Sequence, residues 1–138
     1  MATVEENIEA ALLDRLRQLT LSPALPVAWP NRKFDPPAGG AYLRVDHLPN
    51  VNERFLLGSA APHHRRGILQ VTAVLPLNQG PTPATKIAGE VAAHFPADLA
   101  LYSEGIKVEV TDAPSRASAL RTDVSWNVPV SINYECFA

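Results

Sequence analysis

The sequence predicts an α+β fold with a mixed, mainly antiparallel sheet and two α-helices packed on one face. Two segments have the three-and-four spacing of apolar residues that is typical of amphipathic helices, and several others alternate apolar and polar residues as strands do. Short turns join the strand segments, which favours antiparallel pairing. With 138 residues, 46% of them hydrophobic, the chain can bury one real core, so we expect a single domain over residues 1–138.

The first predicted helix spans residues 3–20. Its apolar face consists of Val4, Ile8, Ala11, Leu12, Leu16 and Leu19. Thr3 and Glu6 have the spacing of a capping box, in which each side chain accepts a hydrogen bond from the other residue's backbone N–H. Pro23 and Pro26 end the helix, because proline disfavours helical geometry in the residue before it.

The second predicted helix follows a Gly-Pro turn. Thr82 is a candidate N-cap, and Pro83 fits the first helical position, where no backbone donor is needed. Its apolar face consists of Ile87, Ala88, Val91, Ala92 and Phe95. Pro96 lies just past its end.

Strands are predicted at Val27–Trp29, Ala41–Leu48, Gly67–Leu77, Ile106–Val110 and Val124–Cys136. In the second of these, Leu43 and Val45 share one face. The last strand gives the clearest signal, because every second residue from Val124 to Cys136, including Trp126 and Tyr134, is apolar or aromatic. Pro129 lies on its other face and cannot donate to a ladder, so it marks an edge, a bulge or a break between two strands.

The charge balance argues against a nucleic-acid or membrane partner. Twelve Lys and Arg residues face fourteen Asp and Glu residues, for a net charge of −2, so no field of one sign is expected. The N-terminus has no basic and apolar signal-peptide pattern, and no uncharged apolar run reaches the ~18 residues of a membrane span. The single cysteine, Cys136, fits a reducing cytoplasm. Any partner is expected to be protein.

No catalytic, cofactor or metal site is predicted. The cluster His63-His64-Arg65-Arg66 suggests a metal site at first sight, but adjacent side chains on a strand point to opposite faces, and no further ligand lies at a known metal-motif spacing. A solvated loop and a subunit contact are the other interpretations. Cys136 lies on the apolar face of the last strand, where a buried and inert thiol is expected.

Two pairs, Asp46 with His47 and His94 with Ser103, offer the side chains of a hydrolase. Neither accompanies the Gly-x-Ser-x-Gly turn on which such a nucleophile is usually built, and phosphate-binding and His-Glu-x-x-His motifs are absent from the sequence. A hydrolase with scattered catalytic residues stays open as an alternative, and it would need perturbed pKa values gathered in one cleft.

The most unusual feature is an apolar triplet, Phe55-Leu56-Leu57, inside the predicted loop 49–66. Arg54, Arg65 and Arg66 accompany it, and apolar side chains surrounded by arginines are common at the centres of protein interfaces. A short strand at residues 53–57, packed on the subunit's own core, is the competing interpretation. We name these six residues as the candidate interface, with residues 112–121 as a second contact loop.

Several sequence features together resemble those of the lambda-type tail terminator family of long-tailed bacteriophages. They are the amphipathic N-terminal helix, Pro-x-x-Trp-Pro-Asn at residues 26–31, Arg66-Gly67-Ile68-Leu69-Gln70-Val71 before Leu75-Pro76, His94-Phe95-Pro96, and Trp126-Asn127-Val128-Pro129-Val130-Ser131-Ile132-Asn133-Tyr134. The resemblance covers nearly the whole chain. Its motifs describe turns and strands and contain no chemical signature.

The resemblance implies a structural subunit without enzymatic activity or cofactor. It implies a hexameric ring that caps the tail tube, ends polymerisation of the major tail tube protein and joins the head connector, in a phage or prophage virion tail made in the host bacterial cytoplasm. Such a ring needs two different patches on each subunit that mate head to tail. Two alternatives remain: another head–tail neck or tail-completion protein, and a small bacterial ligand-binding domain, which would show a deep apolar pocket.

Overall fold

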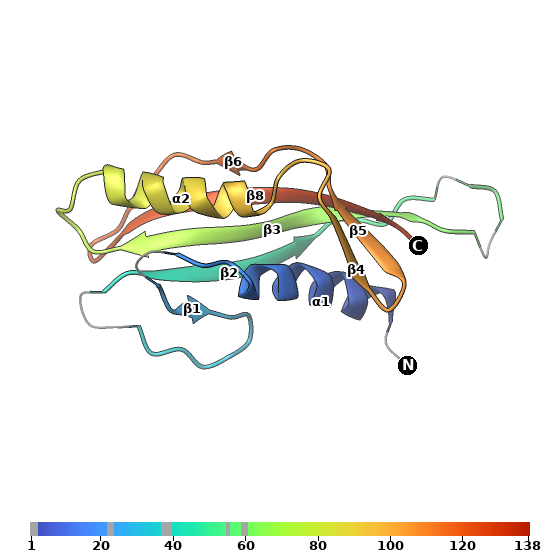
Figure 1. The fold of residues 1–138 in the computed structure, drawn as a ribbon, viewed down its shortest axis with the longest axis horizontal. Helices are drawn as coiled ribbons and strands as arrows, with labels where there is room; N and C mark the ends of the chain where they lie inside the picture. Colours follow the sequence, from blue (N-terminus) through green and yellow to red (C-terminus); the bar gives the residue numbers. More distant parts are fainter. Residues whose placement is uncertain (1–2, 22–23, 37–39, 55, 59–60) are drawn as a thin grey trace.

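The computed structural model describes residues 3–21, 24–36, 40–54, 56–58 and 61–138. Two helices and a curled sheet form the fold in the order α1 (Val4–Arg17), β1 (Val27–Ala28), β2 (Tyr42–Pro49), β3 (His64–Leu75), α2 (Thr82–His94), β4 (Ala100–Ser103), β5 (Ile106–Val110), β6 (Ser115–Arg116), β7 (Leu120–Arg121) and β8 (Trp126–Phe137) (Figure 1). The predicted α+β class is confirmed. Pro23 and part of the predicted turn before β2, residues 37–39, lie outside the described residues.

The sheet is mixed and mostly antiparallel. Its strand order is β1-β2-β3-β8-β5-β4, and β6 and β7 pair with β8 beside β5. β1 runs parallel to β2, and the other strand pairs are antiparallel. The long ladder between β3 and β8, from His64↔Phe137 to Leu75↔Trp126, forms the middle of the sheet.

The first helix has the predicted cap. The Glu6 N–H donates to Thr3 Oγ1 at 3.2 Å, and the Thr3 N–H donates to Glu6 Oε2 at 2.8 Å. The helix ends at Arg17, before the predicted boundary at residue 20, because the Gln18 and Leu19 N–H groups turn back in tight bonds to the carbonyls of Arg15 and Leu16. Arg15 and Arg17 lie in the last turn, where the helix dipole favours positive charge.

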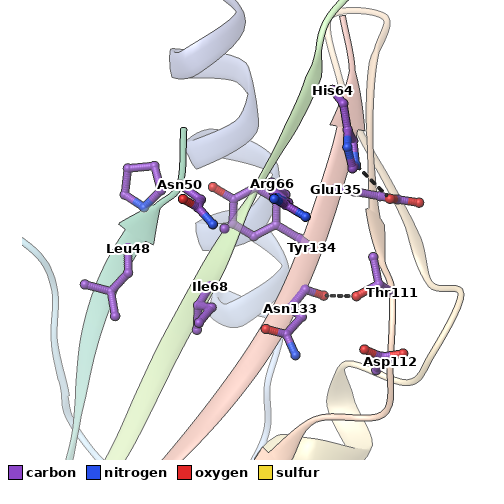
Figure 2. A pocket seen from close by; sticks show the side chains of 12 residues that line it. Leu48, Asn50, His64, Arg66, Ile68, Thr111, Asp112, Asn133, Tyr134 and Glu135 are labelled. Atoms are coloured by element: carbon purple, nitrogen blue, oxygen red, sulfur yellow. Dashed lines mark hydrogen bonds and ion pairs between the residues drawn. The ribbon is translucent and has the colours of Figure 1, made fainter. Parts of the chain in front are cut away.

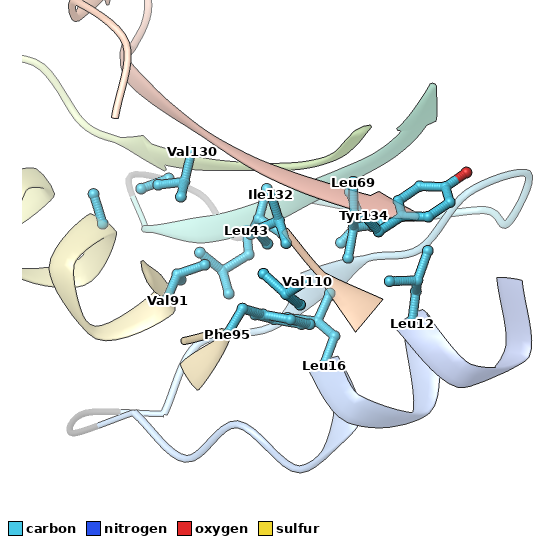
Figure 3. Packing of buried hydrophobic residues seen from close by; sticks show 14 of the residues in the cluster. Leu12, Leu16, Leu43, Leu69, Val91, Phe95, Val110, Val130, Ile132 and Tyr134 are labelled. Atoms are coloured by element: carbon cyan, nitrogen blue, oxygen red, sulfur yellow. The ribbon is translucent and has the colours of Figure 1, made fainter. Parts of the chain in front are cut away.

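Both helices pack on the same face of the sheet and share one core (Figure 3). Leu12 and Leu16 of α1 lie beneath the sheet, and Val91 of α2 and Phe95 just after it fill the space between the helices and the strands. The sheet side of the core includes Leu43, Val45, Leu69, Val71, Val108, Val110, Val130 and Ile132. The helix face of the sheet therefore carries the hydrophobic core, and we call the other side the outer face.

The predicted alternation of β8 is confirmed in its centre and wrong at its start. Side chains from Val128 to Cys136 at every second position are buried, but Val124 is 81% exposed because β8 begins only at Trp126. β8 continues unbroken through Pro129. The Pro129 carbonyl accepts from the Ala117 N–H on the β6 side, so the proline nitrogen points away from β3 and that ladder needs no donor there.

Three other boundaries differ from the prediction. β3 begins at His64, so Arg65 and Arg66 lie in a strand and not in the loop predicted for 49–66. Residues 115–116, predicted as polar loop, pair with β8. In α2 the N-cap position is Pro81 and Thr82 is already helical. The missing N–H of Pro83 costs nothing, because the first turn of a helix has no intrahelical acceptors.

Candidate functional site

The described residues between β2 and β3 project beyond the sheet as an arm (Figure 1). We define the arm by the described residues 50–54, 56–58 and 61–63. Its base is fixed by backbone bonds: the Asn50 N–H donates to the Arg66 carbonyl at 2.9 Å, and Glu53 and His64 exchange two bonds of 2.8 Å. The arm therefore continues the β2–β3 hairpin and leaves the body of the subunit with a defined direction.

The described apolar residues of the arm are uncovered. Leu57 is 97% exposed, Val51 is 76% exposed and Leu56 is 44% exposed. Arg54 donates to the carbonyls of Leu56 and Leu57, at 3.3 Å and 2.6 Å, so its guanidinium satisfies the backbone of the arm. Phe55 lies outside the described residues. The strand expected at 53–57 is reduced to the single bridge at Glu53, and neither leucine is buried in the subunit's own core.

The two arginines predicted beside the apolar triplet point to opposite faces, as neighbours on a strand must. The Arg65 side chain lies on the helix face and is only 17% exposed; it pairs with Glu5 of α1 and donates to the Ala138 carbonyl at 3.2 Å. Arg66 lies on the outer face, is 48% exposed and pairs with Glu53 at the base of the arm. Arg65 thus ties α1 to β3, and Arg66 ties the arm to the sheet.

His64 adds a second tie on the outer face. Its Nε2 lies 3.0 Å from Glu135 Oε2, its Nδ1 lies 3.9 Å from Glu53 Oε2, and its ring stacks on Phe137 with the centroids 4.7 Å apart. The first prediction for this segment, a loop cluster of His63 to Arg66, is replaced by a strand start whose side chains are divided between the two faces.

A partly buried chain of polar side chains, which the sequence did not reveal, joins α1 to the sheet. His47 Nε2 lies 2.7 Å from the Tyr134 hydroxyl, and His47 Nδ1 lies 3.1 Å from Glu9 Oε2. Burial raises the pKa of Tyr134 to about 12, so its hydroxyl stays protonated and available to hydrogen-bond with the imidazole. Gly67 makes room for this contact, because a Cβ there would lie 2.6 Å from the Tyr134 hydroxyl.

The residue pairs considered for a hydrolase are kept apart. Asp46 faces outward and pairs with Arg44 at 3.7 Å, whereas His47 is engaged by Glu9 and Tyr134. The His94 ring lies 2.6 Å from the Arg15 carbonyl, and its own carbonyl accepts two bonds from the Arg15 guanidinium. The Ser103 hydroxyl donates to Asn7 Oδ1 at 2.9 Å. His47, His94 and Ser103 each bind a residue of α1, whereas Asp46 pairs within β2.

Cys136 is buried, as predicted, at 1% exposure. Burial raises the pKa of its thiol, which keeps the sulfur in its less reactive protonated form. In the described part of the chain, no three His, Cys, Asp or Glu side chains gather as metal ligands would. No helix among the described residues is long and apolar enough to cross a membrane.

A groove of about 410 Å³ lies on the outer face, beside the base of the arm (Figure 2). Its floor is a cross-strand row of Leu48, Ile68 and Asn133, contributed by β2, β3 and β8. Asp112 lines one wall and Glu135 another, and Arg66 lies at the arm end. We call this the outer-face groove. It combines apolar and polar side chains in an open surface suited to contact with protein.

Comparison with known proteins agrees with these features. A family model described as "Phage tail terminator protein" matches residues 7–134. One solved structure, which carries no functional description, is 37% identical and has a TM-score of 0.76, with 94% of this chain and 92% of that chain covered. A search of curated proteins found no match. The family model spans nearly the whole chain, which confirms the resemblance found in the sequence and supports a structural role in the phage tail. The chain belongs to the phage tail terminator protein family.

Proposed function

We propose that this protein forms a ring that caps the tail tube, stops addition of further tube subunits and joins the tail to the head connector. Membership of the terminator family supports the tail location and the structural role. The observation that carries the proposal is the arm, in which Leu57 is 97% exposed and Leu56 44% exposed although the subunit has a well-filled core of its own. Apolar side chains displayed on a projecting, anchored segment are typical of a surface that a partner covers.

The proposed ring contains six copies of one domain, each spanning residues 1–138. A closed ring of identical subunits uses two different patches per subunit, each mating with the other patch on the next copy. Neither capping the tube nor joining the head connector requires a covalent bond to be made or broken, so the protein acts through binding and not as an enzyme. The major tail tube protein and the head connector protein are the proposed partners on the two faces of the ring.

The six predicted interface residues divide into two roles in this proposal. Arg54, Phe55, Leu56 and Leu57 supply the contact itself, and Leu56 and Leu57 become buried when the subunit meets a tube end. Arg65 ties β3 to α1 through Glu5, and Arg66 ties the arm to the sheet through Glu53. Because burial of the arm needs a partner, the ring forms on the tube and not in free solution.

The test uses purified tail tubes, wild-type protein and the variant Phe55→Ser with Leu56→Ser. The variant is expected to keep the wild-type circular dichroism spectrum, because Leu56 packs on nothing in the core, and to lose the ring at the tube end in electron micrographs. The control is Tyr102→Ser, which removes a large side chain that is 68% exposed from the β4–β5 hairpin. An unchanged ring in the arm variant would sink the proposal. A ring that binds purified connectors but not tubes would identify a neck protein instead.

A further inference from the structure

We propose that the turn at Leu120–Ser125 of one subunit docks in the outer-face groove of a second copy of the chain. This inference rests on the proposed function, because it supplies the head-to-tail contact that the ring requires. It assigns the two mating patches to particular residues, and neither patch belongs to the exposed tip of the arm.

The turn presents apolar side chains on a fixed backbone. Val124 is 81% exposed and Leu120 is 60% exposed. The Thr122 side chain holds the turn in shape, since its hydroxyl oxygen accepts from the N–H groups of Val124 and Ser125 at 3.3 Å and 3.0 Å, and the Thr122 N–H donates to the Ser125 carbonyl at 2.9 Å. A preformed turn loses little conformational freedom when it binds. These features are those of a rigid knob.

The groove offers matching apolar surface. Leu48 and Ile68 stand side by side on its floor, and Leu48 is 48% exposed. Figure 2 shows the two side chains in front of the sheet with Asp112 across the groove from them. A convex turn that carries valine and leucine fits a hollow floored by leucine and isoleucine, and burial of these four side chains removes apolar surface from water on both partners.

Charge complementarity selects the partner. Within the described part of the chain, the side chains of Arg121 in the turn and Asp112 in the groove make no ion pair and no hydrogen bond. A second copy therefore brings an unpaired guanidinium to an unpaired carboxylate. Glu135 in the same groove is paired with His64, and Arg66 is paired with Glu53, so Asp112 is the carboxylate of the groove that is left for a partner. Opposite charges placed in this way steer association and fix its register.

A subunit cannot fill its own groove. The turn precedes Trp126 at one end of β8, and the groove includes Asn133 near the other end. A strand rises about 3.3 Å per residue, so about 23 Å of β8 separates Trp126 from Asn133. The two patches are different surfaces at opposite ends of one long strand, so repeating the contact from copy to copy produces a head-to-tail chain that can close into a ring.

Disulfide trapping tests the contact directly. One full-length chain carries Val124→Cys and a second, distinguishable by mass, carries Leu48→Cys; the two are mixed at high concentration under mild oxidation. We expect the mixed disulfide dimer in at least about tenfold greater yield than from Val124→Cys mixed with Tyr102→Cys, because Tyr102 is more exposed than Leu48, 68% against 48%, but lies on another surface. Equal yields from the two mixtures would overturn the inference.

A charge exchange in the same assay tests the pairing of Arg121 with Asp112. Adding Arg121→Glu to the Val124→Cys chain, or Asp112→Arg to the Leu48→Cys chain, should each lower the yield about tenfold. Combining both changes should restore it, because the opposite charges are then exchanged across the contact. Arg116→Glu, an exposed arginine outside the turn, is the control and should leave the yield unchanged. Failure of the combination to restore the yield would refute the pairing.

The outcomes separate this inference from the proposed function. Selective trapping by a protein that does not cap tail tubes would support the turn-to-groove contact and refute the capping function. Capping of tubes by a protein whose trapping shows no selectivity would support the function and refute the contact.

Discussion

Substitution of Gly67 by alanine tests the packing between β2, β3 and β8 most sharply. Gly67 is paired with Pro49 on one side and with Tyr134 on the other. A Cβ at this position would lie 2.6 Å from the Tyr134 hydroxyl, 2.8 Å from the Leu48 carbonyl oxygen and 2.9 Å from the Pro49 Cα. Two of these three atoms belong to backbone, so a side-chain rotation cannot relieve the contact.

The expected loss of stability in Gly67→Ala has two parts. Overpacking of a filled site destabilises by about 1–3 kcal/mol, and displacement of the Tyr134 hydroxyl from His47 loses a hydrogen bond of about 0.5–1.5 kcal/mol. We expect Gly67→Ala to lower the free energy of unfolding by about 2–4 kcal/mol. For a chain of this size, the melting temperature should fall by about 7–14 °C.

Thermal and urea unfolding, followed by circular dichroism, measure this effect. Gly89→Ala is the control, because Gly89 lies in α2 with no atom near its Cβ position and alanine favours a helix; it should stabilise by about 0.5–1 kcal/mol. Tyr134→Phe should cost less in the Gly67→Ala background than in the wild type, since it removes one of the clashing atoms. A melting temperature of Gly67→Ala equal to that of the wild type would refute the assigned packing.

The remaining predictions concern Tyr134, Trp126 and Arg65. The folded-state pKa of Tyr134 is about 12, against 10.0 for the free group. The contribution of protonated Tyr134 to the free energy of unfolding, about 2–3 kcal/mol, is therefore complete below pH 10 and is lost between pH 10 and 12. Alkaline unfolding of Tyr134→Phe should lack this loss. The indole N–H of Trp126 is buried without a partner in the described structure, so the free energy of unfolding of Trp126→Phe should lie within about 1 kcal/mol of the wild-type value. Trp126→Ala deletes a large side chain packed against the core and should lower that free energy by about 3 kcal/mol. Arg65→Ala should lower stability by about 1–2 kcal/mol, a loss that an exposed arginine such as Arg116 would not show in urea unfolding.

Local signals accounted for most of the fold. The Thr3–Glu6 capping box, the apolar spacing that buries Leu12 and Leu16, and the alternation that buries Val130 and Ile132 all act within one turn of helix or along one strand. Such patterns are complete in the sequence and need no knowledge of the partner strand. The class and the shared helix face followed from them.

Features that depend on pairing could not be predicted. Arg65 and Arg66 were placed in the predicted loop 49–66, but the register with Cys136 and Glu135 extends β3 to include them. The contacts of Tyr134 with His47 and of His47 with Glu9 join residues far apart in the sequence. The outer-face groove exists only because the register of three strands places Leu48, Ile68 and Asn133 in one row.

The six-residue candidate interface stays a prediction. The exposure of Leu56 and Leu57 agrees with an apolar segment that the subunit does not bury. The internal roles of Arg65 and Arg66 were not visible, because Glu5 and Glu53 reach them only in the folded chain. Val124 was assigned to the core because it continues the alternation of β8, and its 81% exposure shows that periodicity alone does not locate a strand end.

We propose that this protein ends tail-tube growth by forming a ring on the tube. The most direct measurement polymerises purified tail tube protein in the presence and absence of the wild-type protein and records tube length and tube ends by electron microscopy. We predict that the protein stops elongation and leaves one ring of six subunits at the end of each tube. Tubes that keep growing at the same rate, with bare ends, would contradict the account.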